Sequence, residues 1–320
     1  MKTTICKLVF LFLTLSVVAP AQVDFTKADA IASSITEKNL PLEDLAKQLT
    51  ETLDSDTEKA RAIYMWVAGN IRYDCKKYRN NKSVRFSGSS DEEIQQKKAT
   101  YLEKSLKRTL KGGRGVCADY SRLYQALGHA AGLEVEYISG HARDFNKPYR
   151  KALGGSHAWN AVKLEGKWHL VDATWGAGYT DGQVKRFTRR LSPGYFMVAP
   201  EVLIQTHFPK ASEWQLLPEA VNEKKFSNLP MVNIADIKFG IEDFSPSVQT
   251  RGNKRVIRLK FKNLPKYFSV TSRKSKPIAF KKQLKDGYVE LVISKSSAKK
   301  IIIWAGNTTK KMDWMAMYKA

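Results

Sequence analysis

Apolar residues recur at three- and four-residue intervals in the first half of the chain, which is the pattern of amphipathic helices. Ser55 or Asp56 is suited to cap the second of these segments, and Gly132 to end the last one. The sequence therefore predicts an N-terminal half built from helices. The segments with this pattern are 25–54, with a break at Leu40-Pro41, 56 to about 78, 92–110 and 118–131.

Strand-like runs follow the last of these helices. Glu165-Gly166 predicts a tight hairpin turn between two of the runs. After residue 217, short runs of alternating apolar and basic residues predict a small antiparallel β-sandwich. The expected fold class is therefore α+β, with a helix packed on an antiparallel sheet and a β-rich C-terminal part. The expected strands are 133–139, 157–164, 167–174, 256–262, 288–293 and 300–304.

Cys117 follows a glycine-rich segment and lies at or near the start of the helix predicted over 118–131. The unpaired N–H groups and the positive end of the dipole at such a position favour a thiolate over a thiol. The same groups are suited to bind the oxyanion of a tetrahedral intermediate. We therefore expect Cys117 to be a nucleophile.

His157 and Asp172 lie on the two strands of the predicted hairpin. If Leu164 faces Lys167, the two residues are diagonal neighbours on one face, close enough for an imidazole–carboxylate hydrogen bond. That bond would fix the imidazole tautomer and leave the other ring nitrogen for the thiol. His169 would lie opposite Val162 on the other face. The predicted catalytic residues are therefore Cys117, His157 and Asp172.

Three motifs around these residues resemble the transglutaminase-like superfamily, and most closely its kyphoscoliosis peptidase type. They are Gly-Val-Cys-Ala-Asp-Tyr-Ser-Arg-Leu, Ser-His-Ala-Trp-Asn-Ala-Val and Trp-His-Leu-Val-Asp-Ala-Thr-Trp-Gly-Ala-Gly-Tyr. With further matches on both sides, among them His207-Phe208-Pro209, the resemblance covers roughly residues 57–217. It implies a papain/transglutaminase-like core with Cys117, His157 and Asp172 as the triad. It leaves the reaction open, because the superfamily includes cross-linking enzymes, peptidases, deglycosylating amidases and members that have lost activity.

The first residues have the pattern of a secretory signal peptide. Lys2 and Lys7 are followed by an apolar run over residues 8–18 and by the small-residue cleavage site Ala19-Pro20-Ala21. We therefore expect a secreted or periplasmic protein that begins near Gln22. The expected organisation is a signal peptide at 1–21, a helical segment at 22–55, a catalytic domain at 56–217 and a basic β-rich domain at 218–320.

Cys75 and Cys117 are the cysteines that remain after such cleavage. In an oxidising compartment, two cysteines also fit a structural disulfide. A disulfide would not explain the position of Cys117 at a helix start, nor its two candidate partners. We expect no cofactor and no metal site, since the histidines and cysteines show none of the usual ligand spacings.

Basic residues are concentrated in the C-terminal part of the chain. Residues 231–320 contain 20 lysine and arginine residues against 6 aspartate and glutamate residues, in a chain of net charge +23. Such a surface would attract an anionic cell-envelope polymer or lipid head groups, whereas nucleic acid is not expected for a secreted chain.

A nucleophilic Cys117 is suited to attack amide carbonyls of a protein or peptide through an acyl-thioester. The resemblance to the peptidase branch, together with the abundance of water, implies that the outcome is hydrolysis. Cross-linking by amine transfer and a non-catalytic binding role are the alternatives.

Overall fold

The computed structural model describes residues 23–37, 39–80, 84–143, 155–234, 238–294 and 297–320. The predicted signal peptide lies outside these residues, as do residues 144–154. Within the described ranges, every helix is too short or too polar to cross a lipid bilayer. The helices are α1 (Thr26–Ser34), α2 (Leu42–Thr50), α3 (Asp56–Asn70), α4 (Cys75–Arg79), α5 (Asp91–Gly112), α6 (Cys117–Ala130), α7 (Ala173–Ala177), α8 (Pro200–Leu203) and α9 (Glu223–Phe226).

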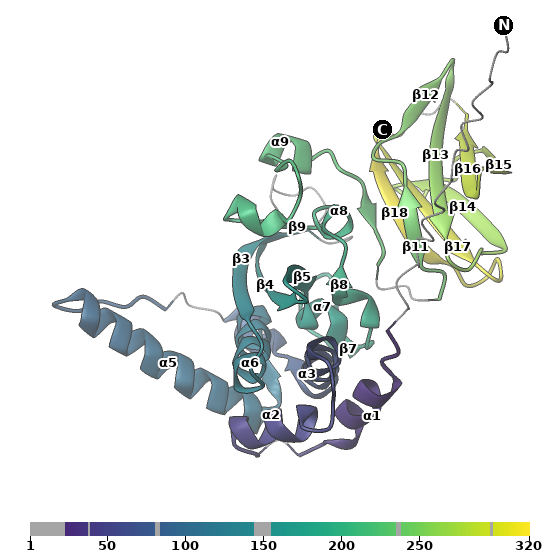
Figure 1. Cartoon of the computed structure of the whole chain (residues 1–320). Coiled ribbons are helices and arrows are strands. Elements are labelled where there is room, and N and C mark those ends of the chain that lie inside the picture. Colours follow the sequence, from purple (N-terminus) through teal and green to yellow (C-terminus); the bar gives the residue numbers. More distant parts are fainter. Residues whose placement is uncertain (1–22, 38, 81–83, 144–154, 235–237, 295–296) are drawn as a thin grey trace, which may run out of the picture.

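A five-stranded antiparallel sheet forms the centre of the N-terminal part, in the strand order β8-β5-β4-β3-β9. Helix α6 packs against β3 and β4, and α2 and α3 pack against α6. Figure 1 shows α5 extending away from this body. The predicted arrangement of a helix on an antiparallel sheet is confirmed. The strands are β3 (Val135–Ala142), β4 (Gly155–Leu164), β5 (Lys167–Val171), β8 (Phe196–Val198) and β9 (His207–Pro209).

The helix predicted over 56 to about 78 is wrong at its C-terminal end. Ser55 caps α3 as expected, but the helix ends at Asn70. The next residues form β1 (Arg72–Tyr73), which pairs in parallel with β2 (Arg114–Gly115). Asp74 then caps the short helix α4 by accepting from the backbone N–H of Lys77 at 2.8 Å. This pairing with a distant segment overrides the local helical pattern.

Two further antiparallel sheets enclose a separate hydrophobic core in the C-terminal part, and the predicted β-sandwich is therefore confirmed. One sheet has the order β10-β18-β17-β14, and the other has β11-β13-β16-β15 with β12 paired to β13. The strands are β10 (Met231–Val232), β11 (Ile241–Phe244), β12 (Gln249–Arg251), β13 (Lys254–Phe261), β14 (Tyr267–Ser272), β15 (Phe280–Lys285), β16 (Tyr288–Ile293), β17 (Lys300–Gly306) and β18 (Asp313–Lys319).

The segment between the two cores packs with the N-terminal part. Phe226 of α9 is buried with Ile204 and Val221. The Arg143 guanidinium lies 4.3 Å from the centre of the Phe226 ring and donates to the carbonyls of Gln205 and Leu229 at 2.8 and 3.0 Å. The Phe226 ring also packs on Phe208 of β9, with ring centres 5.0 Å apart. The residues after 217 therefore pack on β9 before the β-sandwich begins. The domain boundaries given above stay a prediction.

Candidate active site

Cys117 is the first residue of α6, with Val116 as the N-cap. The Asp119 carboxylate stabilises this helix start by accepting from the backbone N–H of Val116 at 2.7 Å. Gly115 leaves the room for that contact, because a Cβ at residue 115 would lie 2.6 Å from the Cβ of Asp119. The expected position of Cys117 at a helix N-terminus, where a thiolate is favoured, is therefore present.

Asp119 is buried and has further partners that the sequence patterns did not reveal. Lys77 donates to both of its carboxylate oxygens at 2.9 and 2.7 Å, and Ser105 donates to Oδ1 at 3.0 Å. These contacts tie α4 and α5 to the start of the nucleophile helix. A buried carboxylate with a cationic partner and neutral donors is satisfied, and it is costly to leave unpaired.

The hairpin of β4 and β5 brings His157 close to Asp172, the residue that follows β5. The strand expected over 167–174 is wrong at its C-terminal end, because β5 ends at Val171 and Asp172 is the N-cap of α7. Leu164 pairs with Lys167 and Val162 with His169, as the expected register requires. The Nε2 atom of His157 lies 2.7 Å from Oδ2 of Asp172, and both side chains are buried. Asp172 also caps α7, because its Oδ1 accepts from the backbone N–H groups of Thr174 and Trp175 at 2.8 and 3.0 Å.

The sulfur of Cys117 faces the imidazole of His157. Burial alone would raise the pKa of the Cys117 thiol, but its hydrogen bond with His157 and the charge of that ring lower the pKa below its usual value. Since Nε2 of His157 is held by Asp172, Nδ1 is the nitrogen left for the sulfur. The three predicted residues are thus brought together in the order thiol, imidazole, carboxylate, and their catalytic roles stay predictions.

The ionisation of His157 and Asp172 follows from their contact. Burial would lower the pKa of His157, yet the adjacent Asp172 carboxylate outweighs it and raises that pKa to about 10. Burial would likewise raise the pKa of Asp172, but His157 and a second imidazole hold it well below its ordinary value. Asp172 is therefore a carboxylate and His157 an imidazolium when the thiol is ionised.

Similarity to known proteins agrees with this arrangement. The family model described as the transglutaminase-like superfamily matches residues 43–173, which include all three residues. Residues 43–173 are a transglutaminase-like superfamily domain. The fold of the N-terminal part is thus of the transglutaminase-like type, with a triad-like His–Asp arrangement at its centre.

Relatives of known name share this domain. Kyphoscoliosis peptidase of Mus musculus is 32% identical over 206 residues, which cover 64% of this chain and 28% of that protein. Hillarin of Drosophila melanogaster is 26% identical over 233 residues, which cover 68% of this chain and 26% of that protein. A solved structure described as a TGase is 20% identical, with a TM-score of 0.29, and the match covers 49% of this chain and 35% of the chain in that structure. The chain spans about a quarter of the length of the two named relatives.

Both cysteines of the transglutaminase-like domain are free thiols, so the disulfide alternative is absent from the structure. Cys75 is the first residue of α4 and is buried, and burial raises the pKa of its thiol. His169 lies opposite Val162, away from the cluster, as expected. The two cysteines therefore differ in the direction of their pKa shifts, and Cys117 is the one suited to react.

Sequence reasoning assigned no chemistry to His207, yet its imidazole lies against the cluster. Its Nε2 atom is 3.0 Å from Oδ2 of Asp172, and the side chain is fully buried. The His207 ring also contacts Trp175 and Trp159, with ring centres 4.5 and 5.1 Å apart. The family-like run His207-Phe208-Pro209 was the available signal, but nothing in it pointed to Asp172.

His157, Asp172 and His207 place three ligand-type atoms within 4.8 Å of one another. Such a group is chemically suited to a metal ion. However, Oδ2 of Asp172 already accepts from both imidazoles, at 2.7 and 3.0 Å. Hydrogen bonds therefore account for the geometry, and we assign the group to the thiol chemistry.

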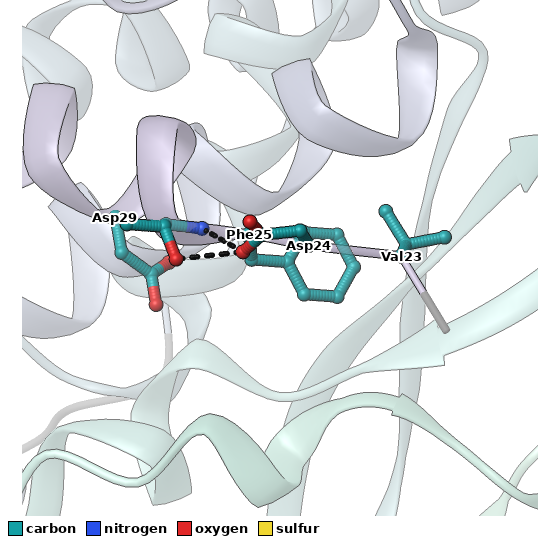
Figure 2. Close-up of a pocket in the computed structure, with 5 residues that line it drawn as sticks. Val23, Asp24, Phe25 and Asp29 are labelled. Atoms are coloured by element: carbon teal, nitrogen blue, oxygen red, sulfur yellow. Dashed lines mark hydrogen bonds between the residues drawn. The ribbon is translucent and has the colours of Figure 1, made fainter. Parts of the chain in front are cut away.

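A hollow of about 400 Å³ lies away from these residues, at the start of α1. Figure 2 shows this pocket, which is lined by Val23, Asp24, Phe25, Thr26 and Asp29. It includes Val23, where the described part of the chain begins. None of its lining residues belongs to the thiol–imidazole–carboxylate cluster, so we give it no part in the chemistry.

Proposed function

We propose that this protein is an extracytoplasmic cysteine enzyme that hydrolyses amide bonds of a protein or peptide, with water as the second substrate. The observation that carries the proposal is the contact of the Cys117 thiol with His157, whose other nitrogen is held by Asp172 at 2.7 Å. A thiol with a lowered pKa beside a carboxylate-bound imidazole is the arrangement that nucleophilic acyl transfer needs.

The reaction would proceed in two steps, acylation of Cys117 and hydrolysis of the resulting thioester. The sulfur of Cys117 attacks the carbonyl carbon, and the imidazolium of His157 donates its proton to the leaving amine as the carbon–nitrogen bond breaks. A thioester then links the acyl group to Cys117. Neutral His157 next accepts a proton from water, which attacks the thioester and regenerates the thiolate and the imidazolium. The backbone N–H groups at the start of α6 are suited to stabilise the oxyanion.

The choice between hydrolysis and amine transfer depends on which nucleophile reaches the thioester. Similarity to proteins named kyphoscoliosis peptidase supports hydrolysis, while the superfamily description supports amine transfer. Water is present at far higher concentration than any amine. We therefore propose hydrolysis, with protein cross-linking through lysine amines as the alternative outcome of the test.

The test is to incubate the purified protein with a peptide library, with and without a primary amine, and to weigh the products. We expect shortened peptides or free acids in both samples, because water resolves the thioester. Products that carry the added amine would instead establish amine transfer.

The location has a test of its own. Protein isolated from the periplasm or the culture fluid is expected to begin near Gln22, as N-terminal sequencing would measure. Recovery of the protein from the cytoplasm with residues 1–21 still attached would contradict the proposed location.

A second role in binding is favoured by the basic edge of the β-sandwich. Strand β15 lies at the end of its sheet, and Lys281, Lys282 and Lys285 on it are exposed. Nearby Glu290 is fully buried, and it is held by Arg251 and Gln283 rather than by these lysines. We propose that this edge attracts anionic envelope polymers or lipid head groups through positive charge.

We expect the double variant Lys281→Glu/Lys285→Glu to bind phosphatidylglycerol vesicles at least about tenfold more weakly than the unaltered protein, since each basic residue near an anionic surface contributes about 1 kcal/mol. Vesicle co-sedimentation at low and moderate salt measures this. Lys104→Glu/Lys111→Glu on α5 makes the same change of charge elsewhere, on exposed residues, and is the control. Equal loss in both variants, or binding that is insensitive to salt, would contradict a role for β15.

A further inference from the structure

His207 reaches the cluster through an edge strand of the central sheet. Strand β9 pairs with β3, and this pairing sets His207 opposite Ala142. The side chain is 1% exposed, and its Nε2 atom lies 3.0 Å from Oδ2 of Asp172. The same oxygen is 2.7 Å from Nε2 of His157. One carboxylate oxygen therefore receives a hydrogen bond from each of two imidazoles.

The contacts of His207 define its tautomer. Oδ2 of Asp172 can only accept, so Nε2 of His207 must carry the hydrogen of the 3.0 Å contact. On the other side, Nδ1 lies 2.8 Å from the hydroxyl of Thr206, whose other acceptor, the Leu203 carbonyl, is 3.3 Å away. Burial lowers the pKa of His207, so the ring is neutral. Because Nε2 carries the one ring hydrogen, Nδ1 is the acceptor toward the Thr206 hydroxyl.

Packing holds the His207 ring in this orientation. The rings of Trp175 and Trp159 meet it edge to face, at 60° and 79°. Trp175 belongs to α7, the short helix that Asp172 caps. The same helix therefore supports both the His207 ring and the Asp172 carboxylate. A rotation of His207 would require movement of two large aromatic side chains in a close-packed interior.

We propose that His207 is a positioning residue, whose neutral Nε2–H holds the Asp172 carboxylate in the orientation that aligns His157 with Cys117. This role rests on the proposed acyl transfer, since His207 would act on the chemistry only through Asp172. The carboxylate is fully buried and has two donors on each oxygen: Thr174 and Trp175 on Oδ1, and the two imidazoles on Oδ2.

Loss of His207 would leave Oδ2 with His157 as its single donor among the described residues. A buried carboxylate that loses a donor is less stable in its charged form and freer to turn. The titratable groups that interact with Asp172 from other elements are His157 on β4, Cys117 and Tyr120 on α6, Tyr64 on α3 and Tyr195 on η1 (Pro193–Tyr195). Burial raises the pKa of the three tyrosines, so they stay neutral and add no charge. The hydroxyls of Tyr64 and Tyr120 already donate to the carbonyls of Ser192 and Ile71.

The test compares His207→Leu with His207→Gln. Leucine fills the space without a donor, whereas the amide nitrogen of glutamine is suited to reach the position of Nε2. For His207→Leu we expect kcat to fall by about 10- to 100-fold with little change in KM, the usual cost of removing an outer hydrogen-bond partner. For His207→Gln we expect recovery of most of this loss. His169→Leu, on the other face of the sheet, is the matched control.

A second readout needs no substrate. The rate at which iodoacetamide alkylates Cys117, measured by mass spectrometry across pH, reports the thiolate directly. In His207→Leu we expect the acid limb of this profile to move to higher pH and to return in His207→Gln, because only the donor is restored. If both variants lose stability equally and keep the profile of the unaltered protein, His207 has a packing role only and the proposal is wrong. If the unaltered protein turns over no amide while the profile still moves in His207→Leu, the proposed function fails and the positioning role stands.

Discussion

Cys117→Ala is expected to abolish amide turnover while the protein stays folded. The change removes one sulfur atom from the first residue of α6 and leaves intact the Asp119 contact with the backbone N–H of Val116. Loss of a nucleophile in a triad lowers kcat by roughly 10⁴-fold or more. Turnover of a cleaved peptide, together with the circular dichroism spectrum and melting temperature, measures both parts of the prediction.

Cys75→Ala is the matched control, because it removes the other free thiol of the domain. It should keep its activity, since burial raises the pKa of the Cys75 thiol and no imidazole is among the groups that shift it. Iodoacetamide should correspondingly label Cys117 faster than Cys75 near neutral pH. Full activity of Cys117→Ala, or faster labelling of Cys75, would refute the proposed mechanism.

Asp172→Asn is expected to lower turnover by about 10⁴-fold at nearly unchanged size, which is the effect of a wrong tautomer in a comparable triad. The backbone N–H groups of Thr174 and Trp175 would hold the amide oxygen of the substituted side chain in place of Oδ1. The amide nitrogen would then face the Nε2 atom of His157. Nε2 would have to accept from this amide, which moves the hydrogen of the imidazole to Nδ1 and toward the sulfur.

The same substitution should change how stability depends on pH. The lowered pKa of Asp172 contributes stability at pH values above 3.8, its pKa in the unfolded chain, and this stability is lost as the pH falls through the folded pKa. The raised pKa of His157 contributes stability at pH values below 6.5, its pKa in the unfolded chain, and this stability is lost as the pH rises toward about 10. The loss of unfolding free energy in Asp172→Asn should therefore be largest between pH 3.8 and pH 6.5. Urea unfolding at several pH values measures this loss, with Asp44→Asn at an exposed position as the control. A loss of unfolding free energy that does not depend on pH would contradict the ion pair.

The active-site hairpin was predictable from the sequence because its geometry is local. Glu165 and Gly166 both adopt positive φ, 49° and 75°, as a two-residue hairpin turn requires. This turn fixes the register of residues 160–164 against residues 167–171. His157 and Asp172 lie just beyond these paired residues, at the same end of the hairpin. The start of α6 at Cys117 was predictable for a similar reason, since glycines before it and periodic apolar residues after it mark a helix boundary.

The remaining features depend on contacts between distant segments. Arg72 and Tyr73 leave the helical pattern because they pair with Arg114 and Gly115, which no local periodicity indicates. His207 meets Asp172 only because β9 pairs with β3. A single sequence shows the residue types but not such pairings, so the second imidazole was missed.

The base and its carboxylate share one hairpin, which bears on how the site assembles during folding. A hairpin with a two-residue turn forms on the microsecond scale from neighbouring residues. The sulfur alone must arrive from a distant part of the chain, when α6 docks on β4. The docking of α6 therefore separates a chain with half a site from one that can react, and the pairing of β9 with β3 adds the second imidazole. An unfolded or partly folded chain carries an unactivated thiol.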